Sequence, residues 1–270
     1  MSDIFDMFKE PAAEQSSPYS SSGYSSSNVF VLSIGGSVIC ARQPNPTAIA
    51  KIAGLVSELS KEGYKFAVVV GGGKTARDYI AAAKSLGANN YATDEIAIAV
   101  TRTNAKLFIQ ALEDSHPEVL TDVNKAKEII SSGKIPVFGG LIPGFTTDTV
   151  AAVIAESLGA KFVNLTNTDG IYTADPKKSK SAKRIPKLNH ERLLRIISGT
   201  DERLPGSNVV LDLFTVMILK RSNIKAFVLD SGSLENIKAA IRGGEFEGTV
   251  IESEGTDDTG SGSEGDLDEI

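Results

Sequence analysis

Short apolar runs alternate with amphipathic helical patterns along most of this chain, and this alternation constrains the fold more than any other feature of the sequence. The runs that predict buried strands are 29–34, 66–70, 135–138, 161–165 and 224–229, with a last strand expected at 247–251. Apolar runs without polar alternation are typical of strands buried on both faces. Strands and helices that alternate in this way form a predominantly parallel sheet with right-handed crossovers. The chain is therefore predicted to be an α/β protein, a three-layer α/β/α sandwich.

Seven segments between and after these strands carry apolar side chains at the spacing of an amphipathic helix. They are 47–61, 93–112, 122–131, 189–198, 208–222, 234–241 and a segment that Thr146, Thr147 and Asp148 open and that runs through Leu158. A further helix, which holds Arg77, is expected directly after the glycines at 71–73. Gly63 is expected to end the first helix, and Thr147 or Asp148 is expected to cap the helix that runs through Leu158. These helices would form the two outer layers of the sandwich.

Glycine or small polar residues follow four of the predicted strands, at 35–37, 71–73, 139–140 and 166–170. The carboxyl ends of parallel strands share one edge of the sheet, and ligands of such folds bind beyond that edge. A glycine turn lets the backbone approach a ligand, and a helix N-terminus presents N–H groups to an anion. The stretch 139–178 offers two such places, the helix opened by Thr146 and the loop that ends at Gly170. The sequence therefore predicts one anion-binding site with two halves.

The turn GGGKT at 71–75 differs from the phosphate-binding P-loop, whose first glycine would fall on Val68 inside the strand. What remains is a glycine turn at a helix N-terminus, followed by the cations Lys74 and Arg77. Such a turn either binds phosphate or only allows the backbone to turn tightly from strand to helix. The residues by themselves leave both interpretations open.

The 93–112 helix is mostly apolar but contains a short polar patch. Its apolar side chains, expected to point mostly inward, are Ile96, Ile98, Val100, Leu107, Phe108 and Leu112. Arg102 and Asn104 in the patch either face solvent or serve a site, and solvent exposure is the favoured interpretation. For Asp148 the simple role is helix capping, which does not exclude catalysis.

The charge of the chain is unevenly distributed. The net charge is -6, but residues 252–270 carry -8 and residues 1–28 carry -3, which leaves +5 for residues 29–251. A mildly basic body suits phosphate-bearing ligands, yet it lacks the basic stripe of a nucleic-acid-binding protein. Residues 1–28 are rich in serine, and residues 252–270 are rich in glycine, serine and acids. Both are predicted to be disordered extensions of one domain at 29–251.

Other features of the sequence indicate in which cellular compartment the protein is expected. No stretch is apolar over the ~18 residues that a membrane span requires. The N-terminus lacks the basic and apolar regions of a secretory signal. Cys40 is the only cysteine, which excludes an internal disulfide and suits a reducing compartment. We therefore expect a cytoplasmic protein that binds neither membranes nor nucleic acids.

Five motifs, in this order, resemble those of the amino acid kinase family: IGGSVI, VVVGGGKTARDYI, VTRTNAKLFI, GGLIPGFTTDTVAAVIAE and TNTDGIYTADPKK. The likeness covers about 29–251 and is strongest to the UMP kinases of the archaeal type. Members of this family share a three-layer α/β fold and transfer the γ-phosphoryl group of ATP to a phosphate, a carboxylate or a related group. The resemblance implies an ATP-dependent kinase that converts UMP to UDP in pyrimidine nucleotide biosynthesis. It also implies a UMP-binding N-terminal half and an ATP-binding C-terminal half.

The resemblance further implies roles for individual residues. The residues implied to bind UMP are Gly35, Gly36, Gly72, Gly73, Arg77, Thr146 and Thr147, the first pair lying close to the transferred phosphoryl group. The residues implied to bind ATP are Asn167, Tyr172, Asp175 and Lys178. Asp148 matches the acid that organises basic residues around the reacting phosphates, and the basic hairpin at 174–187 would close over the triphosphate. Asp148 and Lys177 are the predicted catalytic residues.

The chemistry implied by the resemblance agrees with the residue inventory. UMP kinases of this type need Mg²⁺ and are typically hexamers, so Mg²⁺, UMP, ATP and a homohexamer built as a trimer of dimers are implied. A phosphate oxygen of UMP is already an anionic nucleophile, and His116 and His190 lie in no motif. Transfer then depends on positioning and on neutralisation of charge. No protein cage for magnesium is expected, because Mg²⁺ keeps waters and binds substrate phosphates.

Two positions depart from the family pattern. Ser33 stands where many members have a lysine before the first glycine pair, and Met217 stands where related UMP kinases have a lysine that faces phosphate. Lys220 lies nearly one turn further along the helix. It can replace the missing lysine only if that side of the helix faces the phosphates.

These departures keep two alternatives open. One is phosphoryl transfer to another acceptor, such as isopentenyl phosphate or acetylglutamate, and the other is a non-catalytic nucleotide-binding or storage protein on the same fold. The segments TRTNA and FTTDTVA favour UMP as the acceptor, and the segments TTDT and DG-x-Y favour catalysis.

Overall fold

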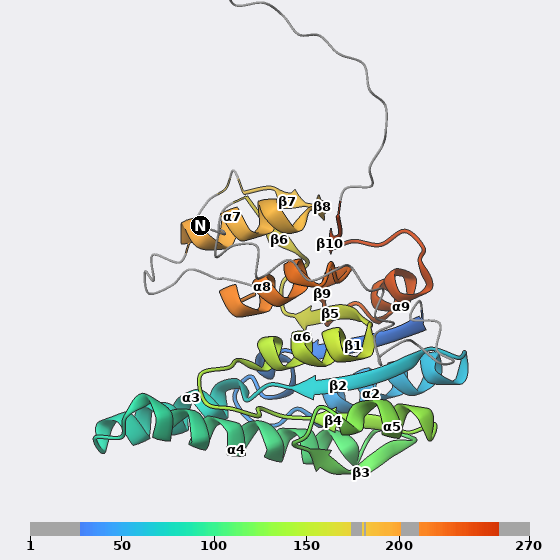
Figure 1. Cartoon of the computed structure of the whole chain (residues 1–270). Helices are drawn as coiled ribbons and strands as arrows, with labels where there is room; N and C mark the ends of the chain where they lie inside the picture. Colours follow the sequence, from blue (N-terminus) through green and yellow to red (C-terminus); the bar gives the residue numbers. More distant parts are fainter. Residues whose placement is uncertain (1–27, 174–179, 181, 201–210, 254–270) are drawn as a thin grey trace, which may run out of the picture.

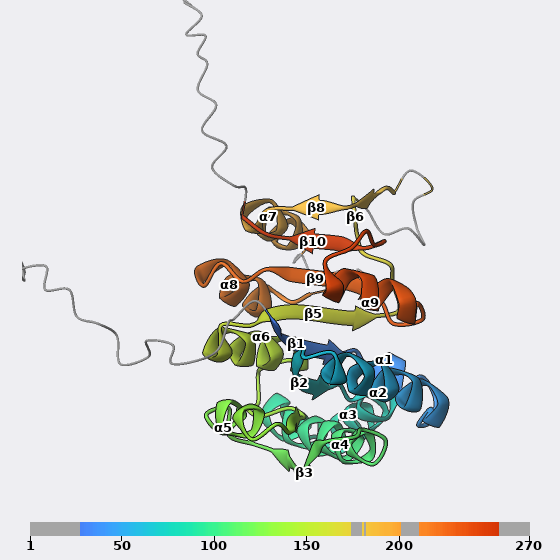
Figure 2. The ribbon, with the colours of Figure 1, turned by 90° about the vertical axis from the view of Figure 1, so that its right-hand side faces the viewer.

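The computed structural model describes residues 28–173, 180, 182–200 and 211–253, which contain a central eight-stranded sheet. Its strands lie in the order β3-β4-β2-β1-β5-β9-β10-β8, from the bottom to the top of Figure 2. Their bounds are β1 Val29–Ile34, β2 Lys65–Val70, β3 Ser115–Leu120, β4 Ile135–Phe138, β5 Lys161–Thr166, β8 Lys187–Leu188, β9 Ala226–Asp230 and β10 Thr249–Ile251. All neighbouring strands are parallel except β10 and β9. A separate antiparallel pair, β6 Ile171–Tyr172 and β7 Arg184–Ile185, forms the base of the predicted basic hairpin.

Helices cover both faces of this sheet, as Figure 1 shows. Their bounds are α1 Gly36–Ile39, α2 Pro46–Lys61, α3 Gly73–Ser85, α4 Asn90–Ile109, α5 Lys125–Ser131, α6 Thr147–Leu158, α7 His190–Thr200, α8 Leu213–Arg221 and α9 Leu234–Arg242. One apolar core contains the buried side chains of α5, α6, α7 and α8, and the other contains those of α1, α2, α4 and α9. The predicted three-layer sandwich with a predominantly parallel sheet is therefore confirmed.

The predicted helices are present, with shifts at their ends. Gly63, whose φ is +97°, follows the end of α2 as expected. α4 begins earlier than expected because the Asn89 side chain accepts the Ala92 N–H and caps the helix at that point. Leu107, expected to point inward, is 39% exposed. Within the described residues, no helix combines the length and the apolar character needed to cross a membrane.

The cap of α6 differs from the prediction. The Thr146 hydroxyl accepts the Thr149 N–H at 3.0 Å, so Thr146 is the N-cap. Thr147 and Asp148 instead lie in the first turn of the helix. The prediction that one of them caps the helix was wrong, and as a result the Asp148 carboxyl is available for another contact.

The carboxyl ends of β1, β2, β4 and β5 meet at one edge of the sheet, as predicted. Ile34 at the end of β1 pairs with Val70 of β2 and with Leu165 of β5, and Phe138 of β4 pairs with Val69. The glycine turns and the loop 166–170 therefore share this edge. Residues 1–27 and 254–270, predicted to be disordered, lie outside the described residues.

Candidate active site

Two of the glycine turns at this edge pack directly against each other. A side-chain carbon at Gly36 would lie 2.0 Å from the Gly73 nitrogen, so only glycine fits there. Gly73 has a φ of +65°, and a side-chain carbon there would lie 2.4 Å from the carbonyl oxygens of Cys40 and Gly36. The Gly71 N–H donates to the Ile34 carbonyl at 3.0 Å and fixes the contact. Backbone packing alone thus requires glycine at these positions.

Gly35 connects these turns to the exit of β5. Its N–H donates to the Leu165 carbonyl at 2.9 Å, and a side-chain carbon on Gly35 would lie 3.1 Å from the same oxygen. Gly35 therefore contacts the end of β5, whereas Gly36 contacts the turn at 71–73. The pair lies between the two expected halves of the site.

The polar patch of α4 holds two glycine turns in place. The Asn104 amide donates to the Gly71 carbonyl at 2.9 Å. Thr101 Oγ1 accepts the Gly140 N–H at 2.7 Å, and Arg102 Nε donates to the Gly140 carbonyl at 3.1 Å. Asn104 is buried and Arg102 is half-buried. The favoured interpretation, that these two side chains face solvent, was therefore wrong, because both bind backbone at the site.

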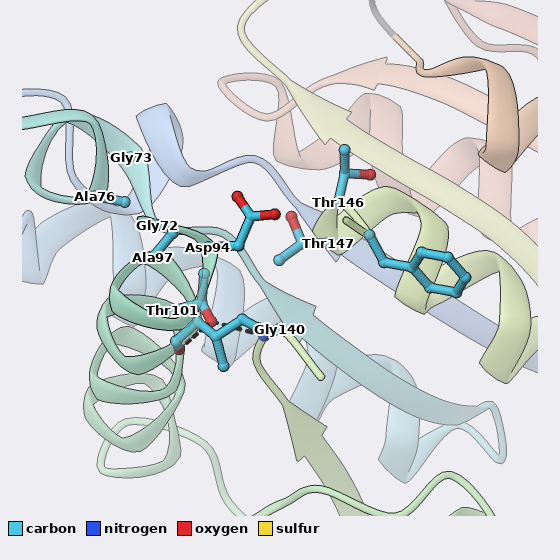
Figure 3. A pocket seen from close by; sticks show the side chains of 11 residues that line it. Gly72, Gly73, Ala76, Asp94, Ala97, Thr101, Gly140, Thr146 and Thr147 are labelled. Carbon is cyan, nitrogen blue, oxygen red and sulfur yellow. Dashed lines mark hydrogen bonds between the residues drawn. The ribbon is translucent and has the colours of Figure 1, made fainter. Parts of the chain in front are cut away.

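A pocket of about 220 Å³ opens between α4 and the N-terminus of α6 (Figure 3). Its lining residues are Gly72, Gly73, Ala76, Asp94, Ala97, Ile98, Thr101, Gly140, Phe145, Thr146 and Thr147. In Figure 3 the side chains of Asp94 and Thr147 point into this space. Asp94 Oδ2 also accepts the Gly144 N–H at 2.8 Å, which fixes the orientation of its carboxylate. Mostly apolar walls with a few polar groups suit a small organic ligand that carries hydroxyl groups.

Part of this lining was predicted and part was missed. Gly72, Gly73, Thr146 and Thr147, implied by the resemblance to bind the acceptor, lie together at the pocket. The contribution of α4 was missed, although its members, at positions 94, 97, 98 and 101, have the i, i+3, i+4, i+7 spacing of one helix face. That spacing is visible in the sequence, but the sequence does not show which layer the face meets.

Asp148 points at the central strands and does not line the pocket. Its Oδ1 accepts the Ser33 hydroxyl at 2.5 Å, and the Asn164 side chain also hydrogen-bonds to it. Ser33 and Asn164 are direct neighbours in β1 and β5. The pKa of Asp148 is raised to about 6, chiefly by burial and to a smaller degree by the charge of Asp212, while the hydrogen bonds from Ser33 and Asn164 oppose the rise. Such a carboxylate is stabilised by a nearby cation, which offsets the cost of its burial.

Asp212 joins α6 to α8 through three threonines. It caps α8 by accepting the Thr215 N–H at 3.0 Å. Its carboxylate also accepts the hydroxyls of Thr146 at 2.6 Å, Thr149 at 3.0 Å and Thr215 at 2.6 Å. Thr149 and Thr215 are buried. The sequence analysis did not identify Asp212 as a site residue. The only local sign of its role is its place three residues before a threonine at the start of a helix, which is typical of an N-cap.

Replacing Asp212 with alanine is expected to lower the free energy of unfolding by about 2–3 kcal/mol. The change removes a helix cap and leaves two buried threonine hydroxyls without this acceptor. Asn45→Ala is the matched control, because Asn45 caps α2 at an exposed position and its loss costs about 1 kcal/mol. Urea unfolding measures both changes, and equal losses would show that Asp212 acts as a simple cap.

The exit loop of β5 forms the other half of the expected site. The Tyr172 hydroxyl donates to Asp169 at 2.7 Å, which raises the pKa of the phenol and lowers that of the carboxyl. Arg184 Nη1 donates to the other Asp169 oxygen at 3.0 Å. Asn167 is exposed, and the buried Thr168 hydroxyl has no hydrogen-bond partner in the described part of the chain. The loop therefore offers polar atoms to a ligand.

Several predicted residues stand apart from these contacts. Arg77 is exposed on α3, directly after the pocket residue Ala76. Asp175, Lys177 and Lys178 lie outside the described residues.

The two positions that depart from the family pattern also have defined surroundings. Ser33 is buried and donates to Asp148, whereas Met217 is 51% exposed. Lys220 lies in the last turn of α8, where its Nζ pairs with Glu191 of α7 at 2.8 Å. Lys220 therefore does not replace the lysine expected at position 217.

Among the described side chains, no group of three or more His, Cys, Asp or Glu residues is arranged to hold a metal ion. A metal that is held chiefly by substrate phosphates needs no such group.

Comparisons with known proteins agree with this geometry. The model of the family described as "Amino acid kinase family" matches residues 28–230. The chain is 41% identical to a uridylate kinase of Thermococcus sibiricus over 83% of this chain and 99% of the relative. The crystal structure of uridylate kinase from Archaeoglobus fulgidus is similar, with a TM-score of 0.73 and 41% identity over 82% of this chain and 99% of that one. A UMP kinase structure from Bacillus anthracis, at 21% identity over 83% and 96% of the two chains, shares the fold with a TM-score of 0.71.

Proposed function

Because the chain belongs to the amino acid kinase family, we propose that it is a UMP kinase, which transfers the γ-phosphoryl group of ATP to UMP and forms UDP for pyrimidine nucleotide synthesis. The observation that carries this proposal is the pocket between α4 and α6. Most of its lining lies in the segments that resemble UMP kinases, and relatives that are 41% and 42% identical to this chain are named uridylate kinases.

We assign the acceptor UMP to this pocket. The turn at 71–73 leads into the N-terminus of α3, where N–H groups and the nearby Arg77 suit a phosphate. The carboxylate of Asp94 suits the hydroxyls of a ribose, and the Thr147 hydroxyl suits the polar edge of uracil. The apolar wall formed by Ala97 and Ile98 suits the flat faces of the nucleoside.

We assign ATP to the side of the loop 166–170, with Asn167 and Tyr172 among its contacts. Gly35 contacts the end of β5 and Gly36 contacts the turn at 71–73, so the two phosphates would meet over this pair. An oxygen of the UMP phosphate attacks the γ-phosphorus, the bond from that phosphorus to the β,γ-bridging oxygen breaks, and ADP leaves. Backbone N–H groups and cations stabilise the charge that develops.

Asp148 lies behind the first glycine pair, bound to Ser33 at the end of β1. We propose that it positions the cationic groups around the reacting phosphates, with Lys177 as one of them. The cost of keeping this carboxylate ionised in a buried place supports the role, because a neighbouring cation removes much of that cost.

We propose that Mg²⁺ enters with ATP. Bound to the triphosphate, it would neutralise charge on the phosphate oxygens. The described residues fit this arrangement, because the site offers isolated carboxylates and no preformed cage.

We also propose a cytoplasmic homohexamer. Large exposed apolar side chains on α3, directly after it and on α4 support self-association: Tyr79 is 58% exposed, Leu86 86% and Tyr91 61%. Use of ATP and a nucleoside monophosphate supports the cytoplasm.

A leucine introduced at Ala97 tests the assignment of UMP to the pocket. We expect the KM for UMP to rise at least tenfold, because the larger side chain fills space that the nucleoside requires. The KM for ATP is expected to stay within twofold. Ala99→Leu, on the exposed side of the same helix, is the matched control and should change neither value. Equal behaviour of the two variants would place the acceptor elsewhere.

A further inference from the structure

Lysines mark the edge of the sheet opposite the candidate active site. Lys65 begins β2, Lys161 begins β5, and Lys225 immediately precedes β9. These strands are parallel, so the three lysines lie at the edge where the strands start. Lys187 of β8 lies near the same edge, because it pairs with Glu252 at 2.9 Å. We call these four residues the lysine edge.

Two members of the lysine edge are direct neighbours. Phe162 pairs with Ala226, and the Phe162 N–H donates to the Lys225 carbonyl at 3.0 Å, which places Lys161 beside Lys225. Like charges at adjacent strand positions destabilise a sheet. Burial lowers the pKa of Lys161, and the charge of Lys225 lowers it further. A pocket of about 240 Å³ lies beside both lysines. Carboxylates beside such a pair reduce the repulsion between its members.

The chain itself brings negative charge to this place. β10 runs antiparallel to β9, so it leaves the sheet at the lysine edge. Glu252, the first residue after β10, bridges Lys225 at 2.5 Å and Lys187 at 2.9 Å. These two lysines lower the pKa of Glu252. The next side chain, Ser253, donates to Asn223, which lines the same pocket.

We propose that the acidic residues of 254–270 bind the lysine edge of their own chain and continue the pattern that Glu252 begins. This segment contains seven Asp or Glu residues and no Lys or Arg. Its 17 residues reach ~56 Å when extended. The four strand spacings from β10 to β2 amount to only ~19 Å. Every member of the lysine edge is therefore within reach.

The expected binding is electrostatic, and any carboxylate of the segment can pair with any lysine of the lysine edge. A single exposed ion pair contributes little, and salt screens it. Several carboxylates held at a high local concentration can nevertheless occupy the edge for most of the time by exchanging among its lysines.

Zero-length carbodiimide cross-linking of the full chain, followed by mass spectrometry, tests the proposal. Acids of 254–270 are expected to link to Lys161 and Lys225 at least tenfold more often than to the exposed Lys84 and Lys106, which lie on α3 and α4. In 0.5 M NaCl the preference should fall several-fold. Similar yields at all lysines would overturn the proposal, as would links formed mainly between differently labelled chains in a mixture.

Cleavage after Glu264 by a glutamate-specific protease gives a second readout. Lys161→Gln combined with Lys225→Gln is expected to speed this cleavage at least threefold at low salt, because the freed segment reaches the protease more often. Lys84→Gln combined with Lys106→Gln is the matched control and should leave the rate unchanged. Equal rates for the two double variants would contradict binding at the lysine edge.

Discussion

Replacement of Asp148 with asparagine is expected to lower kcat by about two to three orders of magnitude, an effect comparable to the loss of one strong electrostatic group in an active site. Asparagine keeps the shape of the side chain and can still accept the Ser33 hydroxyl. It removes the negative charge that we propose positions cations around the phosphates. Steady-state kinetics at saturating UMP and ATP measures the effect.

The same substitution has a distinctive effect on stability. In the folded chain burial raises the pKa of Asp148 from 3.8 to about 6, so between these values the folded state binds more protons than the unfolded state. The contribution of Asp148 to stability therefore falls as the pH rises through this window, and above it the group is destabilising. Asp148→Asn should thus melt at the same or a higher temperature at pH 8. Its melting temperature should also depend less on pH between 4 and 6.

A matched control is Asp114→Asn, at an exposed aspartate that pairs with Lys134. It should leave kcat unchanged. If Asp148→Asn retained near-normal turnover with an intact fold, Asp148 would not act on the reacting phosphates. If it lost turnover only because it melted early, the carboxyl would be structural.

Gly36→Ala is expected to destabilise the protein by about 3 kcal/mol or more, because the added carbon would lie 2.0 Å from the Gly73 nitrogen and 2.7 Å from the Gly72 nitrogen. These atoms belong to backbone that carries the turn, and they cannot rotate away as the end of a side chain does. The turns at 35–37 and 71–73 must separate. We expect early unfolding in urea, and loss of activity in any folded fraction.

Gly54→Ala is the matched control for this change. Gly54 lies within α2, and nothing lies within 4 Å of a side-chain carbon at that position. Alanine there should stabilise the protein by about 1 kcal/mol, the difference in helix propensity. A Gly36→Ala protein as stable as the parent would show that the two turns are not packed as described.

Elements whose apolar side chains are buried in a continuous run were predicted from the sequence. Elements that are only partly buried were missed. β2, with five apolar residues of six, and β5, which is buried from Phe162 to Leu165, were placed within a residue or two. β3 was missed, because its sequence SHPEVL contains a proline and polar residues that an edge strand can leave exposed. The antiparallel direction of β10 was also invisible, since three residues carry no signal of direction.

The residues of the candidate site likewise divide into those that the sequence revealed and those that it did not. Glycine turns and the threonine at the start of α6 were visible, because their chemistry lies in short local patterns. The positions of Asp94 and Asp212 depend on which elements meet across the layers. Asp212 is 66 residues from Thr146 in the chain, yet their side chains lie 2.6 Å apart. Spacing along a sequence does not encode such contacts.

The acceptor specificity of the purified protein tests directly whether it is a UMP kinase. ADP release from ATP and Mg²⁺ would be measured with UMP, CMP, dUMP, isopentenyl phosphate and acetylglutamate, and UDP would be identified by chromatography. We expect kcat/KM for UMP to exceed that for each other acceptor by at least tenfold, which would show that Ser33 and Met217 are tolerated. A higher kcat/KM for another acceptor would contradict the UMP assignment, and ATP binding without turnover on any acceptor would contradict a kinase function.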